Sequence, residues 1–153
     1  MSSGLIKVLL VEDSLADATL ILEVLKEEKI AAEVHVARDG IEAMQYLEKE
    51  GEHADAATPD LVILDLNLPR MDGREVLFRM KKMPSLDKIP IVILTTSQSE
   101  EDITSSYQLQ ASCYVSKPID LDQFVKIVKS IDNFWFTAVH YPPKPLSPPA
   151  AKP

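Results

Sequence analysis

Three acidic residues and one lysine stand directly after short apolar runs, where they could do chemistry together. Glu12 and Asp13 follow VLLV, Asp65 follows LVIL, and Lys117 follows YVS. Continuous apolar runs of this kind are typical of strands buried on both faces of a parallel sheet. Because ligands bind outside the carboxyl ends of such strands, we expect all four side chains to meet in one pocket.

This combination of charges predicts a metal-assisted reaction of phosphate. Neighbouring carboxylates raise one another's pKa unless a cation neutralises them. Mg²⁺ is suited to this role, because it prefers oxygen ligands and is often held by one or two carboxylates plus a phosphate. An aspartate can act as a nucleophile and form an aspartyl-phosphate. Mg²⁺, Lys117 and the hydroxyl of Thr95 would then stabilise the phosphoryl group on Asp65.

Five apolar segments predict the strands that position these groups. They are Ile6–Val11, Glu33–Ala37, Leu61–Leu64, Ile91–Leu94 and Cys113–Val115. Segments with apolar residues at helical spacing alternate with the strands. Five strand–helix pairs imply right-handed crossovers and a doubly wound α/β sheet with five helices. We expect the flavodoxin-like strand order 2-1-3-4-5.

Caps and apolar stripes outline the five helices. Ser14 or Asp13 caps the first helix and Asp39 the second. The third helix ends before Pro84, and the fourth is expected over Glu100–Leu109. The residues predicted to face inward from the first, second, third and fifth helices are Ala18, Ile21, Leu22 and Leu25; Ala43, Met44 and Leu47; Val76, Leu77 and Met80; and Leu121, Phe124, Val125 and Val128.

Composition narrows the class of protein. The 153 residues suffice for one domain with its own core. The net charge of −8 argues against nonspecific binding to nucleic acid or to an anionic membrane surface. No stretch approaches the roughly 20 apolar residues of a membrane span. Cys113 is the only cysteine, which fits a reducing compartment, so we expect a cytoplasmic protein. Residues 1–136 are expected to form the domain and residues 137–153 a Pro-rich extended tail.

Four motifs together make the chain resemble the receiver domain of two-component response regulators over residues 5–133. They are Glu12-Asp13, DLNLPRMDG at 65–73, ILTTS at 93–97 and KP at 117–118. The resemblance implies a signalling protein of a phosphorelay, not an enzyme, with a histidine kinase as partner. On phosphorylation, the surface of the fourth helix, fifth strand and fifth helix would change its binding preference.

The resemblance also implies a role for each residue of the acidic pocket. Asp65 would be the phosphoacceptor. Asp13 would bind the metal directly, Glu12 would act largely through water, and Asn67 would offer its backbone carbonyl. Lys117 would pair with the phosphoryl group.

Further residues would sense the phosphorylated state. Thr95 would move toward the phosphoryl group, and Tyr114 occupies the aromatic switch position. Pro118 would follow a cis peptide bond. Thr96 departs from the family, which usually has Ala or Gly at the corresponding phosphoryl-binding position, and its extra bulk puts the rate of turnover in doubt.

The last helix carries apolar residues outside its inward-facing stripe: Ile127, Ile131, Phe134 and Trp135. Monomers rarely expose large apolar patches, so this face needs cover. Either the Pro-rich tail folds back over it or it forms an interface. The chain is also similar to regulators paired with phytochrome-type histidine kinases, in IPIVILTTSQSEEDI at 89–103, Tyr107, ASCYVSKP at 111–118 and DNFWFTAVHYPP at 132–143. This resemblance implies dimerisation through the last helix and the C-terminal segment, and it favours a homodimer.

Three other functions fit the sequence less well than a phosphoacceptor. An Asp-nucleophile phosphohydrolase of small phosphate esters is the main alternative, but its second aspartate would be needed where Asn67 stands. A nucleotide-binding domain would need a Gly-rich phosphate loop, which is missing. A partner-binding module without phosphorylation would not need the intact pocket. His35, His53 and His140 lie far apart in sequence, so no zinc site is expected.

Overall fold

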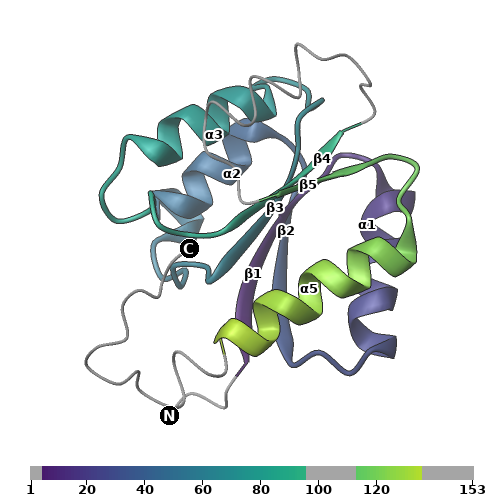
Figure 1. Cartoon of the computed structure of the whole chain (residues 1–153). Coiled ribbons are helices and arrows are strands. Elements are labelled where there is room, and N and C mark those ends of the chain that lie inside the picture. The colour runs from purple at the N-terminus through teal and green to yellow at the C-terminus, as the bar shows by residue number, and fades with distance from the viewer. Residues whose placement is uncertain (1–4, 96–112, 136–153) are drawn as a thin grey trace.

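Five parallel strands form one sheet in the order β2-β1-β3-β4-β5 (Figure 1). The computed structural model describes residues 5–95 and 113–135. The strands are β1 (Ile6–Val11), β2 (Ala32–Ala37), β3 (Leu61–Asp65), β4 (Ile91–Thr95) and β5 (Cys113–Ser116). This confirms the predicted flavodoxin-like order. All five residues of β3 are buried, as expected of a central strand covered on both faces.

Within the described residues, three α-helices and one short 3₁₀ helix connect strands, and a fourth α-helix follows β5. They are α1 (Leu15–Glu27), α2 (Gly40–Leu47), α3 (Gly73–Lys81), α5 (Leu121–Trp135) and the 3₁₀ helix η1 (Gly51–His53). The predicted helix over Glu100–Leu109 lies outside the described residues. No helix of the described ranges is long and apolar enough to cross a membrane.

Side-chain caps begin three of these helices. Ser14 accepts a hydrogen bond from the N–H of Asp17, and Asp39 accepts one from the N–H of Glu42. Both caps were among those predicted. Asp72 does the same for α3, where its Oδ1 lies 2.7 Å from the backbone nitrogen of Arg74. Each cap satisfies a backbone donor that has no partner within its own helix.

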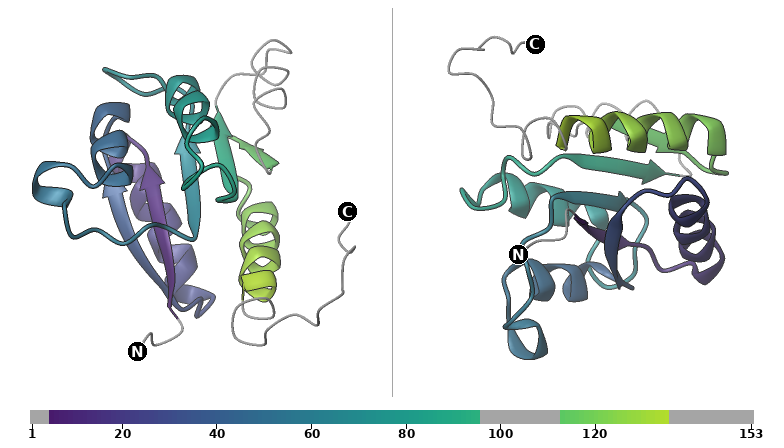
Figure 2. Two further views of the ribbon diagram at one scale, coloured as in Figure 1. Left: turned by 90° about the vertical axis from the view of Figure 1, so that its left-hand side faces the viewer. Right: turned by 90° about the horizontal axis from the view of Figure 1, so that it is seen from below.

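The helices cover the two faces of the sheet in pairs, with α1 and α5 on one face and α2 and α3 on the other (Figure 2). Two of the predicted inward-facing residues are wrong: Leu22 is 37% exposed and Leu121 is 40% exposed. On α1 the buried stripe includes Val24 instead, which places Leu22 at its margin. Leu121 is the first residue of α5, and a helical side chain covers the turn N-terminal to its own position, which here lies beyond the helix.

The loop after β3 is held between the starts of two helices. A Cβ on Gly73 would lie 2.2 Å from the carbonyl oxygen of Asp65, so α3 begins in direct contact with the end of β3. A Cβ on Gly40 would lie 2.1 Å from the carbonyl oxygen of Met71, so α2 presses on the same loop. Neither position has room for a side chain. The start of α3 therefore fixes the end of β3, and the start of α2 fixes the loop that follows it.

Candidate functional site

Asp65 ends β3 with its carboxylate held at both oxygens. Its side chain is almost fully buried, and its backbone pairs with Leu94 of β4. Oδ1 accepts a hydrogen bond from the N–H of Asn67 at 2.9 Å. Oδ2 lies 3.0 Å from the ammonium nitrogen of Lys117. A strand buried on both faces thus ends on a rigidly oriented carboxylate.

Glu12 and Asp13 bring two further carboxylates to the same place from the end of β1. Glu12 is fully buried, and its Oε2 accepts a hydrogen bond from the N–H of Ser14 at 3.1 Å. Asp13 is exposed to solvent. Each of Glu12, Asp13 and Asp65 offers an oxygen within 4.8 Å of the others. The structure therefore brings together the three acidic residues that the strand ends indicated.

Lys117 stands between carboxylates from three elements. Its Nζ lies 2.8 Å from Glu12 Oε1, 2.9 Å from Asp17 Oδ2 and 3.0 Å from Asp65 Oδ2. Only 8% of its side-chain surface is exposed. The peptide bond between Lys117 and Pro118 is cis, in agreement with the expectation.

Asp17 is the member of this group that the sequence interpretation missed. It lies in the first turn of α1, three residues after the cap Ser14. A signal for it was present, because the first turn of α1 immediately follows the carboxyl end of β1. An acidic residue there also suits the helix dipole, which gave it an ordinary explanation.

Burial and charge shift the proton affinities of this group. Burial raises the pKa of Glu12 to about 7, against the opposing effects of Lys117 and the N–H of Ser14. Burial also acts to lower the pKa of Lys117, but its contacts with Glu12, Asp17 and Asp65 outweigh this effect and raise the pKa above its usual value. Three carboxylates thus share one ammonium ion, and the neighbouring Asp13 adds a fourth, so acidic groups outnumber the cation.

The excess charge and the donor atoms fit a hard divalent cation. Glu12, Asp13 and Asp65 supply only oxygen, which Mg²⁺, Ca²⁺ and Mn²⁺ prefer. The exposure of Asp13 leaves one side open to water, which Mg²⁺ tends to keep in its coordination shell. A cation here would supply the charge compensation that one lysine cannot complete.

The remaining predicted residues are placed only by their backbones. Thr95 ends β4 and pairs with Ser116, and Tyr114 of β5 pairs with Ile93. The carboxyl end of β4 therefore lies beside that of β3. The side chains of Thr95 and Tyr114 and all of Thr96 fall outside the described residues.

The predicted interface on α5 is described in part. Ile127 packs partly against the core between α1, α5 and the sheet. The side chains of Ile131, Phe134 and Trp135 lie outside the described residues. Their role therefore stays a prediction.

Comparison with known proteins agrees with this geometry. Residues 8–129 match the family described as response regulator receiver domain. Response regulator Rcp1 of Synechocystis sp. is 47% identical over 135 residues, which cover 88% of this chain and 92% of the relative.

Solved structures give the same result. The Mn²⁺-bound form of response regulator Rcp1 is 46% identical, with a TM-score of 0.76, covering 88% of this chain and 96% of that one. The phosphorylated cyanobacterial phytochrome response regulator RcpA is 49% identical, with a TM-score of 0.77, covering 91% and 99%.

Proposed function

Because the chain belongs to the family of response regulator receiver domains, we propose that it works by accepting a phosphoryl group on Asp65 from a histidine kinase. One observation carries the assignment: a buried carboxylate lies 3.0 Å from a buried ammonium and within 4.8 Å of two further carboxylates. The likeness to a phytochrome response regulator favours a phytochrome-type kinase as the source. The protein is then a phosphoacceptor in a phosphorelay, not an enzyme that turns over free substrates.

Transfer requires the Asp65 carboxylate to attack the phosphorus of a phosphohistidine. A new O–P bond forms, the N–P bond breaks, and its electron pair stays on the imidazole of the kinase. Asn67 orients the Asp65 carboxylate through its N–H. Lys117, already 3.0 Å from Asp65, supplies positive charge to the phosphoryl oxygens.

Mg²⁺ is the cation that we propose for the acidic pocket, with Asp13 and Asp65 as direct ligands, the Asn67 carbonyl as a third and Glu12 acting through water. When bound, it would neutralise charge on the transferring phosphoryl group. A bound cation would favour the ionised form of the buried Glu12 carboxylate, which keeps the pocket negatively charged. Such a cation would oppose both the burial and the smaller repulsion from Asp65 that raise the pKa of Glu12.

The response to phosphorylation is proposed to run along β4 and β5. The carboxyl end of β4 lies beside that of β3, and β5 pairs with β4, so we propose that Thr95 contacts a phosphoryl group and that Tyr114 reports this contact. The α4-β5-α5 surface, where α4 denotes the helix predicted over residues 100–109, would change its binding preference. We also propose that the chain forms a homodimer through Ile127, Ile131, Phe134 and Trp135. The receiver domain is proposed to cover residues 1–136, and the tail residues 137–153. The proposed location is the cytoplasm, without nucleic-acid or membrane partners.

The phosphoacceptor assignment can be tested by intact mass. The protein is incubated with Mg²⁺ and acetyl phosphate, and we expect one added phosphoryl group that hydroxylamine removes. Asp65→Asn and EDTA should each abolish it. Asp60→Asn is the matched control, because Asp60 accepts a hydrogen bond from Lys7 at the opposite end of β3 and an asparagine can still accept it. Labelling that persists in Asp65→Asn would overturn the assignment.

A further inference from the structure

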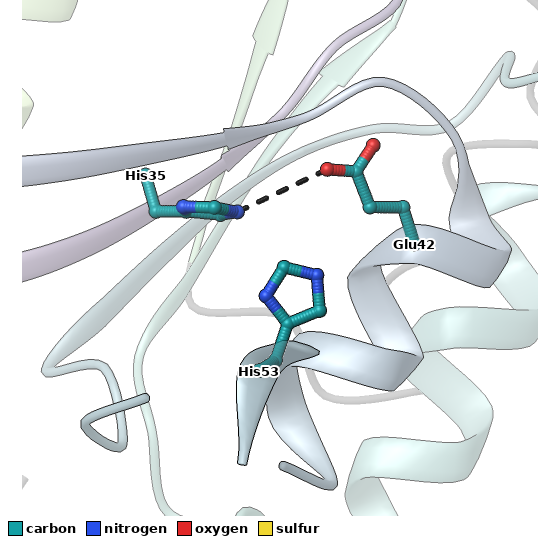
Figure 3. A group of neighbouring side chains, drawn as sticks. All are labelled: His35, Glu42 and His53. Atoms are coloured by element: carbon teal, nitrogen blue, oxygen red, sulfur yellow. Dashed lines mark ion pairs between the residues drawn. The ribbon is translucent and has the colours of Figure 1, made fainter. Parts of the chain in front are cut away.

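A second group of potential metal ligands lies apart from the acidic pocket and shares no residue with it. His35 comes from β2, Glu42 from the first turn of α2 and His53 from the end of η1. The three side chains point toward one another (Figure 3). One atom from each lies within 4.8 Å of the others. Residues spaced widely along the chain thus converge at the β2 edge of the sheet.

His35 and Glu42 are held in place by neighbouring groups. The ring of Tyr46 stacks on the ring of His35, with centroids 4.2 Å apart and planes inclined by 16°. Oε1 of Glu42 accepts a hydrogen bond from the N–H of Arg38 at 3.0 Å. Its other oxygen, Oε2, faces Nε2 of His35 at 3.9 Å. Both ligands are therefore oriented before any ion binds, which reduces the entropy lost on binding.

Nε2 of His35 is buried and has no hydrogen-bond partner within the part of the chain that the structure describes. The distance of 3.9 Å to Glu42 is too long for a hydrogen bond. A buried polar atom without a partner costs free energy, so its presence calls for an explanation. A bound ion between His35, Glu42 and His53 would supply the missing partner.

The charges beside the cluster are compatible with a bound cation. Among the described residues that line the adjacent groove, Lys7 is the only lysine or arginine, and its ammonium is already paired with Glu33.

We propose that His35, Glu42 and His53 form a binding site for a divalent transition-metal ion of the zinc class. Two imidazoles and one carboxylate are a donor set used by zinc, whereas Mg²⁺ prefers oxygen alone. Tetrahedral coordination at about 2.0–2.2 Å needs ligand atoms roughly 3.3 Å apart. The distance of 3.9 Å between His35 and Glu42 is close to this value. His53 lies on a three-residue helix, with a ring nitrogen within 4.8 Å of a ligand atom of each of the other two residues.

The site would tie three segments together and leave one position open. A metal would join the edge strand β2 and the start of α2 to the connection between α2 and β3. Three protein ligands leave a fourth position for water or a group from another molecule. A groove of about 380 Å³, lined by His35, Tyr46 and Asp55 among others, borders the cluster on the His35 side. This inference does not depend on phosphorylation of Asp65.

The first test measures zinc binding by calorimetry on the full chain in excess Mg²⁺, which occupies oxygen-rich sites. We expect one zinc ion per chain at this site. His53→Gln and Glu42→Gln should each weaken it by at least roughly 100-fold. Glutamine at 42 can still accept the hydrogen bond from Arg38, so α2 should remain intact, as circular dichroism would verify.

His140→Gln and Asp13→Asn are the matched controls for this experiment. His140→Gln removes the third histidine of the chain, and Asp13→Asn weakens the acidic pocket. Both variants should keep the zinc affinity of the parent. Co²⁺ gives a second readout, because tetrahedral nitrogen and oxygen ligation produces an intense visible spectrum that the octahedral acidic pocket would not. Zinc binding that is absent, unchanged by His53→Gln, or lost in either control would overturn the proposal.

Discussion

The acidic pocket and the histidine cluster differ in how the fold assembles them. In the pocket, Glu12 and Asp65 each follow the last residues of a buried strand, so the parallel sheet itself aligns them. In the cluster, one ligand lies in the middle of an edge strand, one on a helix and one on a 3₁₀ turn. The positions of the pocket residues follow from the strand order of the sheet. The histidine cluster depends on the path of the connection between α2 and β3, which contains η1.

Their electrostatics differ as well. The pocket concentrates carboxylates around a buried ammonium, and Glu12, Asp65 and Lys117 are almost entirely removed from solvent. The cluster is half-buried and combines two imidazole rings with a single carboxylate. The pocket is therefore adapted to a hard cation and phosphate, and the cluster to a softer metal. Similar substitutions made in the acidic pocket and in or near the histidine cluster should therefore have different effects on stability and metal binding.

The largest effect is expected when the charge of Lys117 is removed. Lys117→Gln leaves Glu12, Asp17 and Asp65 without their cation, and removal of one partner from a buried ion pair costs about 3–5 kcal/mol of unfolding free energy. Urea unfolding in EDTA measures this loss. Mg²⁺ should restore more stability to the variant than to the parent, because it takes over the neutralising role.

Lys7→Gln is the control for that prediction, because it removes a lysine near the histidine cluster. Lys7 pairs with Glu33 in an exposed position, where solvent screening leaves an ion pair with little effect on stability. If the two variants lose equal stability, the ammonium of Lys117 does not hold the pocket together as described.

A second large effect is expected at the backbone contact that fixes Asp65. Gly73→Ala places a Cβ 2.2 Å from the carbonyl oxygen of Asp65, so the start of α3 must move away from β3. We expect about 3 kcal/mol of lost stability, since strain at a close backbone contact belongs to the severe class of substitutions. Phosphorylation by acetyl phosphate should slow in parallel. A variant of parental stability and rate would show that the loop yields without disturbing Asp65.

The sequence sufficed for the sheet and most of the pocket because both depend on strong local patterns. Apolar runs identified the strands, and the residues after them identified Glu12, Asp13, Asp65 and Lys117. Asp17 was missed because a first-turn acidic residue has an ordinary helix-dipole explanation. Leu22 was misplaced because it borders the buried stripe of α1, where helical spacing alone does not separate margin from centre.

The histidine cluster could not have been predicted in the same way. His35 and His53 are 18 positions apart, and neither lies beside a residue pattern typical of zinc. The segment 51–60 reads as an ordinary loop, yet residues 51–53 form the helix η1 that carries His53 to His35. The spacing of apolar residues in this segment does not predict that His53 lies beside His35. Separation in sequence therefore did not reveal that His35 and His53 lie close in space, and our proposal departs from the prediction of no zinc site on this ground.

An intermediate effect is expected when the metal of the pocket is removed. A ligand present at 100 times its dissociation constant stabilises a protein by about 2.7 kcal/mol. We expect Mg²⁺ at that excess to stabilise the parent by about this amount in thermal unfolding, and Asp13→Asn to lose most of it. Because Asp13 is exposed, its substitution should change metal-free stability little.

Glu42→Gln is the counterpart in the histidine cluster for this prediction. It should retain the full response to Mg²⁺, because Glu42 does not belong to the acidic pocket. A loss of Mg²⁺ stabilisation in Glu42→Gln equal to that in Asp13→Asn would mean that the two regions are not independent.

The smallest effect is expected at Gly51, where the connection turns toward His35. Gly51 has a φ of +57° with open space around its Cβ position, so the only cost of a side chain there is the left-handed conformation. Gly51→Ala should therefore lose about 1 kcal/mol of stability, much less than Gly73→Ala. Gly51→Asn should lose less, because asparagine tolerates this conformation. Since η1 begins at Gly51 and ends at His53, zinc affinity should fall in Gly51→Ala and recover in Gly51→Asn, as calorimetry would measure. Equal zinc affinity in all three proteins would show that the conformation of this turn does not position His53.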